Sequence, residues 1–418
     1  MTTTNDSIND APDAVPNPML ASEIQQSPVT FVRGYLRRLR AGDLGSLPII
    51  VGLIIIAVIF QTQNENFLTP RNFVNLILQM AGITTIAYGV VFVLLLGEID
   101  LSVGYVSAVA AVALTLMLRP PTVIPWYVAL PLALLIAAAI GVLHGLIITV
   151  IQIPAFVVTL AGLLAWNGVV LLIIGEGGTI ILQDNTILGL TNSYLPHQIG
   201  WLAGALFILY LAYNQYSRIR IRRSANLSYT PPIVAGAQVA FLGLLILIVI
   251  FIADQDRGVP LIGVILLFLL GGLSFLAERT RFGRYVYAIG GNKEAARRAG
   301  IKVEQIRIMV FMISSLMAGL GGIVLAARLR SVATNAGGGD LLLNSIAAAV
   351  IGGTSLFGGR GKVSSAVLGA LVIASVQSGM GLLGLSAGSQ FIVTGLVLLM
   401  AAAVDALSRR SQRRSGLA

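Results

Sequence analysis

The chain has no cysteine, only two histidines and little charge, and each shortage excludes a class of chemistry. Without cysteine, its 418 residues can form no disulfide, thiol nucleophile or thiolate-bound metal site. The two histidines, His144 and His197, lie far apart in the sequence, so we expect no histidine-based metal site. Only 11% of the residues are charged and 56% are hydrophobic, a composition too apolar for a soluble domain.

The charged residues that remain are mostly basic and cluster at the ends of apolar segments. A formal net charge of +10 would suggest nucleic acid as a partner of a soluble protein. Here membrane topology explains the basic residues more simply, and we expect no nucleic acid partner. Several apolar runs reach roughly the 18 residues of a membrane-spanning helix. With 46 glycines and 15 prolines, the pattern predicts an all-α, polytopic transmembrane bundle surrounded by membrane lipid.

The chain divides into four segments by composition. Residues 1–28 are polar and lack the basic and apolar regions of a signal peptide, so we predict a disordered cytoplasmic tail. Residues 29–46 alternate apolar and arginine positions with helical spacing, which predicts an amphipathic helix at the inner membrane surface. Residues 47–407 form the predicted transmembrane domain, and residues 408–418 a basic cytoplasmic tail.

About 12 crossings with both termini in the cytoplasm are predicted from the apolar runs and the flanking charge. The short run at 341–357 is counted on parity alone, because the basic C-terminal tail should lie inside. The predicted crossings are residues 47–61, 72–96, 101–118, 126–150, 155–174, 201–213, 233–252, 259–276, 306–327, 341–357, 363–382 and 391–407.

The loop at 278–305 is the most highly charged segment between two apolar runs. Asn292 can cap a short helix there, with Glu294 in its first turn. Arg297 and Arg298 fall in the last turn, and Gly300 suits the left-handed residue that ends it. We predict a two-turn cytoplasmic helix with an alanine face. Spacing alone favours one of the many short loop helices of membrane proteins, without a special role.

Two carboxylates interrupt the apolar sequence at Gly97-Glu-Ile-Asp-Leu-Ser-Val-Gly104. Ionised groups within membrane segments are expensive and are usually functional. One interpretation is a broken helix that lines a transport pathway, with Glu98 and Asp100 accepting hydrogen bonds from sugar hydroxyls. The other is structural, since Asp100 or Ser102 can cap the following helix. Glu98 has no such structural role in the sequence.

The sequence offers no site for covalent chemistry or for ATP. The stretch Gly358-Gly-Arg-Gly-Lys362 has the wrong glycine spacing for a phosphate-binding loop and lacks the Ser or Thr that would bind magnesium. We find no pairing of nucleophile and base. The chain is therefore not predicted to be an enzyme or to bind a cofactor itself.

Several blocks resemble one known family. Gly290 to Ile301 resembles the coupling-helix loop of sugar permeases in bacterial ABC importers, and the block at 97–104 resembles another segment of these permeases, with Glu98 as in xylose-type members. The blocks at 153–160 and 346–361 match as well. The region 202–276 looks like the extra pair of spans of the xylose type. Overall the resemblance covers about residues 67–405.

This resemblance implies an inner-membrane permease subunit that translocates a monosaccharide by alternating access. Xylose is the first candidate for this sugar. It implies a second copy of the chain, cytoplasmic ATPase subunits that hold ATP and magnesium, and a periplasmic or lipid-anchored sugar-binding protein. Asn344-Ser345 replaces the Asp-Ala of ribose-type members, which makes ribose the less expected ligand. The alternative is an ion-coupled secondary sugar transporter that uses Glu98 and Asp100, although no internal inverted repeat is detected.

The candidate residues form two sets. The set for ATPase coupling is Gly291, Asn292, Glu294, Arg297, Arg298 and Gly300. The set for the substrate pathway is Glu98, Asp100, Ser102, Phe156, Thr159, Asn344 and Thr354.

Overall fold

The computed structural model describes residues 47–175, 178–225, 227, 229–386, 388–396, 399 and 403. The predicted tails at 1–28 and 408–418 and the predicted interfacial helix at 29–46 lie outside these residues. The described chain falls into two compact units: residues 201–249 belong to one, and the described residues on either side of them belong to the other.

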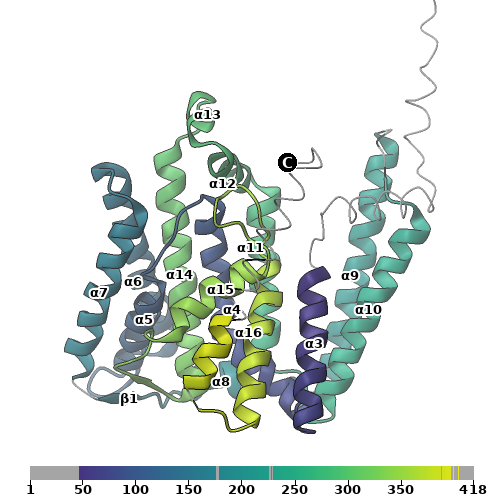
Figure 1. Cartoon of the computed structure of the whole chain (residues 1–418), viewed down its shortest axis with the longest axis horizontal. Coiled ribbons are helices and arrows are strands. Elements are labelled where there is room, and N and C mark those ends of the chain that lie inside the picture. The colour runs from purple at the N-terminus through teal and green to yellow at the C-terminus, as the bar shows by residue number, and fades with distance from the viewer. Residues whose placement is uncertain are drawn as a thin grey trace, which may run out of the picture. The chain divides into compact units, whose positions relative to one another are not determined.

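The larger unit is a bundle of helices (Figure 1). Its helices are α3 (Leu47–Gln63), α4 (Pro70–Leu95), α5 (Val103–Leu118), α6 (Trp126–Leu146) with the π-helical turn η1 (Ile147–Ile151), α7 (Ala155–Ile174), α8 (Asn185–Asn192), α11 (Leu261–Arg279), α12 (Arg281–Gly291), α13 (Lys293–Arg298), α14 (Val303–Leu329), α15 (Asp340–Ile351) and α16 (Ser365–Leu382).

Helices α4 and α14 form the centre of this unit. In the most apolar window of α4, 83% of the residues are buried, against 67% in α14 and 22% in α7. Glycines bring the backbones together: a Cβ added at Gly89 of α4 would lie 2.9 Å from the carbonyl oxygen of Ser314 in α14. Gly322 of α14 likewise lies against the backbone of Ser107 in α5. Small residues permit such close contact between membrane helices, so the central helices pack tightly.

The smaller unit is a pair of helices. It contains most of α9 (His197–Ser224) and of α10 (Pro232–Asp254), whose other ends belong to the larger unit. Within the pair, Gln215 Nε2 donates to Gln238 Oε1 at 3.3 Å, and a Cβ added at Gly243 would lie 3.4 Å from Ile208. Phe207 stacks on Tyr210, one turn further along α9, with 6.2 Å between the ring centroids.

Most predicted helices are confirmed, and seven of the described helices are long and apolar enough to cross a membrane. The shorter apolar helices are α3, α5 and α15. Helix α15 has 12 residues, or about 18 Å at 1.5 Å per residue, less than a hydrocarbon core of about 30 Å. The predicted crossing at 341–357 therefore is not one continuous helix. The total of 12 crossings and the side of each terminus stay predictions.

At two places the structure adds elements or length that the predicted crossings did not specify. The segment between the predicted crossings at 155–174 and 201–213 contains β1 (Thr179–Ile181) and α8, and β1 pairs antiparallel with β2 (Ser331–Ala333), which follows α14. The crossing expected to end at residue 213 belongs to α9, which continues to Ser224. Since a helix can carry its polar turns into water, the arginines at 218–223 form the last turns of α9.

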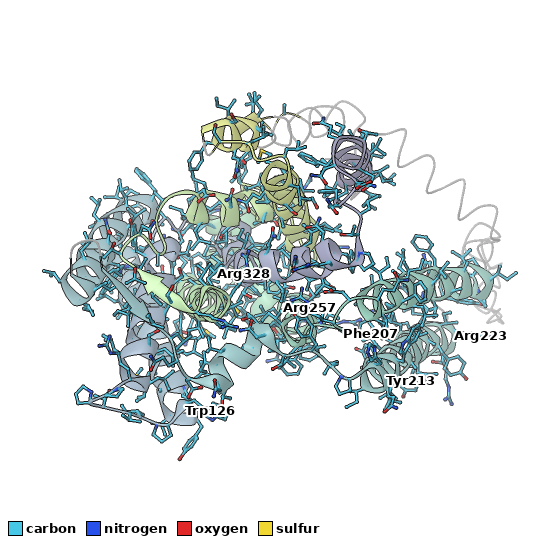
Figure 2. The ribbon with its side chains drawn as sticks, turned by 90° about the horizontal axis from the view of Figure 1, so that it is seen from below. Trp126, Phe207, Tyr213, Arg223, Arg257 and Arg328 are labelled. Atoms are coloured by element: carbon cyan, nitrogen blue, oxygen red, sulfur yellow. The ribbon has the colours of Figure 1, made fainter. Side chains whose placement is uncertain are left out.

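The end of the larger unit opposite α13 carries aromatic and basic side chains, several of them labelled in Figure 2. Trp126 and Tyr127 begin α6 and meet edge to face, with centroids 5.9 Å apart. Arg257 donates to Asn75 Oδ1 at 2.9 Å, and its guanidinium lies 4.9 Å from the ring centre of Tyr194. Tryptophan and tyrosine favour the boundary between membrane and water, so this end suits a membrane surface.

Candidate functional site

The predicted short helix in the charged loop is confirmed as α13, which projects from one end of the bundle (Figure 1). The Asn292 side chain accepts a hydrogen bond from Ala295 N at 2.9 Å, as an N-cap does. Glu294 lies in the first turn and both arginines in the last. Gly300 has φ of +81°, the left-handed conformation expected there. Of the predicted alanine face, Ala295 and Ala299 are exposed and open to a partner, whereas Ala296 is buried.

The two arginines of α13 have different surroundings. Arg297 bridges Glu294, at 3.2 Å, and Glu304 in the first turn of α14, at 2.8 Å. These two carboxylates raise the pKa of Arg297, chiefly through its hydrogen bond to Glu304. Arg298 is exposed and forms no ion pair with any described residue. Arg297 therefore fixes the corner between α13 and α14, whereas Arg298 is free to contact a partner.

Helix α12, which leads into α13, was not predicted. Its N-cap is Thr280, whose hydroxyl accepts from Gly283 N at 3.3 Å. Val286 and Ile289 are buried on one face, three residues apart as an amphipathic helix requires. That spacing could have predicted α12, but the charged residues on the opposite face obscured the pattern.

Asp100 lies in the break between α4 and α5 and is only 2% exposed. One carboxylate oxygen, Oδ1, accepts from Ser102 N at 3.0 Å and from Ser102 Oγ at 2.6 Å. The other, Oδ2, accepts from Ser314 Oγ of α14 at 3.0 Å. Asp100 thus stabilises the turn that enters α5, although it is not the N-cap residue of that helix, and also connects that turn to α14. Ser102 occupies the N-cap position but makes no side-chain cap hydrogen bond.

The hydrogen bonds at Asp100 continue through two further helices. Ser102 Oγ lies 3.3 Å from Nδ1 of His144 in α6, and Trp166 Nε1 in α7 donates to His144 Nε2 at 3.1 Å. Gly162 makes room for this imidazole, since a Cβ there would lie 2.6 Å from His144 Nε2. His144 is 3% exposed. We call these groups, from Asp100 through Ser102 and His144 to Trp166, the polar chain.

Glu98 pairs with Arg307 of α14. The Oε1 atom accepts from Arg307 Nε at 2.6 Å and lies 2.6 Å from Nη2. The side chains are 16% and 12% exposed, and Glu98 Oε2 is buried without a partner among the described residues. A charge so poorly solvated needs a counter-charge. Arg307 supplies the structural role that was not visible in the sequence.

The structure gathers some of the predicted pathway residues and separates others. Thr159 Oγ1 donates to Ala155 O at 2.9 Å and lies 3.4 Å from Ile99 O in the break. Phe156 is 55% exposed on the outer side of α7. Thr354 is buried in the loop between α15 and α16, 3.5 Å from Ser365 Oγ. Glu98, Asp100, Ser102 and Thr159 therefore surround the break, and Phe156 does not point into it.

Asn344 belongs to a separate polar cluster on α15 and α16. Its Nδ2 donates to Asp340 Oδ2 at 3.1 Å, and Gln377 Nε2 lies 3.4 Å from the same oxygen. Asn344 Oδ1 is buried and has no partner among the described residues. Sequence reasoning missed Asp340 and Gln377, as it missed His144, Trp166, Arg307 and Ser314. Asp340 lies one helical turn before Asn344, so this contact could have been noticed; the other five positions bond partners 22 or more residues away, which no local pattern marks.

Comparison with known proteins decides the family. A family model described as "Branched-chain amino acid transport system / permease component" matches residues 72–402. The xylose transport system permease protein XylH of Escherichia coli (strain K12) is 37% identical over 383 residues, covering 89% of this chain and 94% of that protein. The ribose import permease protein RbsC of Bacillus subtilis (strain 168) is 32% identical over 364 residues, covering 87% and 94%.

The chain belongs to the permeases of ribose- and xylose-type ABC importers. This confirms the resemblance of its sequence blocks. With seven apolar helices long enough to span a bilayer among its described residues, this permease is a multi-pass protein of the bacterial inner membrane. No solved structure matches it.

Proposed function

We propose that this permease forms the membrane pathway of a sugar importer and that xylose is the sugar it prefers. The observation that carries the proposal is the 37% identity to a xylose permease over 94% of that protein, against 32% identity to a ribose permease. Asn344-Ser345, in place of the Asp-Ala of ribose-type members, favours xylose over ribose.

In this proposal the working complex contains two copies of the chain, two cytoplasmic ATPase subunits that hold ATP and magnesium, and a periplasmic or lipid-anchored binding protein. Both termini and α13 lie on the cytoplasmic side. Exposed polar groups of α13, especially Arg298, contact the ATPase together with Gly291, Asn292, Glu294, Arg297 and Gly300. Closure of the ATPases on ATP displaces α13 and opens the pathway alternately outward and inward.

For the pathway we propose the residues around the break, namely Glu98, Asp100, Ser102 and Thr159, with Phe156, Asn344 and Thr354 at other levels. Two observations support a polar route here. Glu98 Oε2 and Asn344 Oδ1 are buried acceptors without a donor among the described residues. Sugar hydroxyls are donors that could satisfy such acceptors once a conformational change exposes them.

The test is sugar uptake into vesicles that contain the purified permease with its ATPase and binding protein. We expect uptake of labelled xylose to require ATP, and excess xylose to compete better than excess ribose. Vesicles with the permease alone are the control. Uptake by the permease alone under a pH gradient would overturn the proposal in favour of the ion-coupled alternative, and stronger competition by ribose would overturn the choice of xylose.

A further inference from the structure

Three backbone segments meet at the base of α13 without side chains between them. They are the end of α4 (Leu95 to Gly97), the end of α12 (Gly290) and the loop between α15 and α16 (Gly358 and Gly359). Gly359 N donates to Leu95 O at 2.9 Å. We call these six residues the glycine junction.

The junction leaves no room for a side chain at Gly290. A Cβ there would overlap the carbonyl oxygen of Leu95 and lie 2.6 Å from Gly359 N. A Cβ at Gly358 would lie 2.7 Å from Gly290 O and 2.9 Å from Gly97 N. Gly97, Gly358 and Gly359 also have positive φ, which side chains disfavour. The three segments are therefore in direct backbone contact.

Two side-chain contacts reinforce this arrangement. Tyr287 of α12 donates its hydroxyl to Gly361 O in the same loop, at 2.8 Å. The Glu98–Arg307 pair joins the break, immediately after the junction, to α14, immediately after α13. Both ends of the α13 segment, at Gly290 and at Arg307, are thus attached to the break between α4 and α5.

We infer that the glycine junction and the Glu98–Arg307 pair are positioning elements that transmit displacement of α13 to the break carrying Asp100. Packed groups in direct contact move together because protein interiors are dense and barely compressible. Only Gly291 and Asn292 separate Gly290 from the first residue of α13. In this view Glu98 holds Arg307 through Oε1, and this role does not depend on whether its other oxygen, Oε2, accepts from a sugar hydroxyl. The inference rests on the proposed function for its consequence in transport, but the attachment itself can be measured separately.

The first test uses Gly290→Ala, with Gly272→Ala as the matched control. Gly272 lies in α11, where an added Cβ meets no described atom within 4 Å. Hydrogen exchange of the purified full-length permease should speed up roughly tenfold at residues 96–102 in Gly290→Ala and stay unchanged in the control, because separating the segments removes protection. Unchanged exchange at 96–102 in a folded Gly290→Ala protein would overturn the attachment.

The same variants are then assembled with the ATPase and binding protein. Gly290→Ala should retain ATP hydrolysis, since α13 itself is unaltered. Its sugar uptake per ATP hydrolysed should fall at least about tenfold. Normal uptake per ATP in Gly290→Ala would overturn the transmission role. If the unmodified complex shows no ATP-driven uptake, the proposed function is wrong, while the exchange experiment still decides whether the junction exists.

A second set of variants tests the ion pair without adding bulk. Glu98→Gln leaves Arg307 buried without a counter-charge, so exchange at 96–102 should rise and uptake should fall. Glu98→Gln combined with Arg307→Gln removes both charges and should recover most of the protection and most of the uptake. If the double variant recovers protection from exchange but not uptake, Glu98 contacts the sugar directly, and the positioning role assigned to it is overturned.

Discussion

The indole Nε1 of Trp166 lies 3.1 Å from Nε2 of His144, and this hydrogen bond fixes the state of the imidazole. An indole nitrogen can only donate, so Nε2 must be the acceptor and the proton of the neutral ring must sit on Nδ1. Nδ1 then donates to Ser102 Oγ, whose own proton goes to Asp100 Oδ1. Every donor of the polar chain therefore points toward Asp100, whose carboxylate accepts at the end.

Every donor of the polar chain points toward Asp100, so removal of the first donor, Trp166, should lower the stability of the whole protein. Trp166→Phe leaves His144 Nε2 buried without a donor, and we expect the free energy of unfolding to fall by about 1–3 kcal/mol. Trp126→Phe, at an exposed position, is the control and should change it by less than about 0.5 kcal/mol. Denaturant unfolding in detergent measures both, and equal effects would contradict the assigned hydrogen bond.

Replacement of Asp100 should cost more than a lost helix cap, which is worth about 1 kcal/mol. Its carboxylate accepts three hydrogen bonds, so Asp100→Ala should lower the free energy of unfolding by roughly 2–4 kcal/mol. Asp100→Asn should be milder, because an amide oxygen still accepts from the turn and the Ser314 hydroxyl can rotate to accept. Thermal unfolding of both variants is the measurement; an Asn variant as unstable as the Ala variant would contradict it.

Charge reversal on α13 should separate insertion from coupling. Arg298→Glu changes a residue with no described partner, so the protein should insert and unfold normally while sugar-stimulated ATP hydrolysis falls at least about tenfold, as a hot-spot arginine would require. Arg297→Glu places a third carboxylate beside Glu294 and Glu304 and should also loosen the helix. Gly291→Pro should abolish the stimulation too. Arg223→Glu on α9 is the control. Normal stimulation with Arg298→Glu would remove α13 as the docking helix.

The native absence of cysteine makes the predicted topology directly testable. Single cysteines at Ser193 and Gln255 should react with an impermeant thiol reagent added from outside. Cysteines that replace Ser224 and Lys293 should react only after the membrane is permeabilised. All four positions are exposed in the structure, so failure to react reports the side of the membrane and not burial. Outside labelling at Lys293 would reverse the orientation of α13.

Where structure depends on neighbours in the sequence, the sequence was sufficient. The cap at Asn292, the charges of the first and last turns of α13 and the left-handed Gly300 all follow from contacts within a few residues. The apolar runs predicted most helices, because burial of a membrane helix depends on its own composition. Helix α12 was not predicted, although the spacing of its buried residues indicates a helix.

The partners of the buried polar groups could not be predicted in this way. Arg307 is 209 residues from Glu98, and Ser314 is 214 residues from Asp100. Nothing in the local sequence of either carboxylate specifies which distant helix supplies its donor. That choice depends on how α4, α5 and α14 pack, and the packing depends on glycines whose close contacts appear only in the folded chain. The sequence by itself therefore determined that this is a helical membrane permease with a capped loop helix. Only the tertiary structure decided that its buried charges are held by protein groups and that α13 is joined to the break, because burial makes each charge require a partner that folding alone brings near.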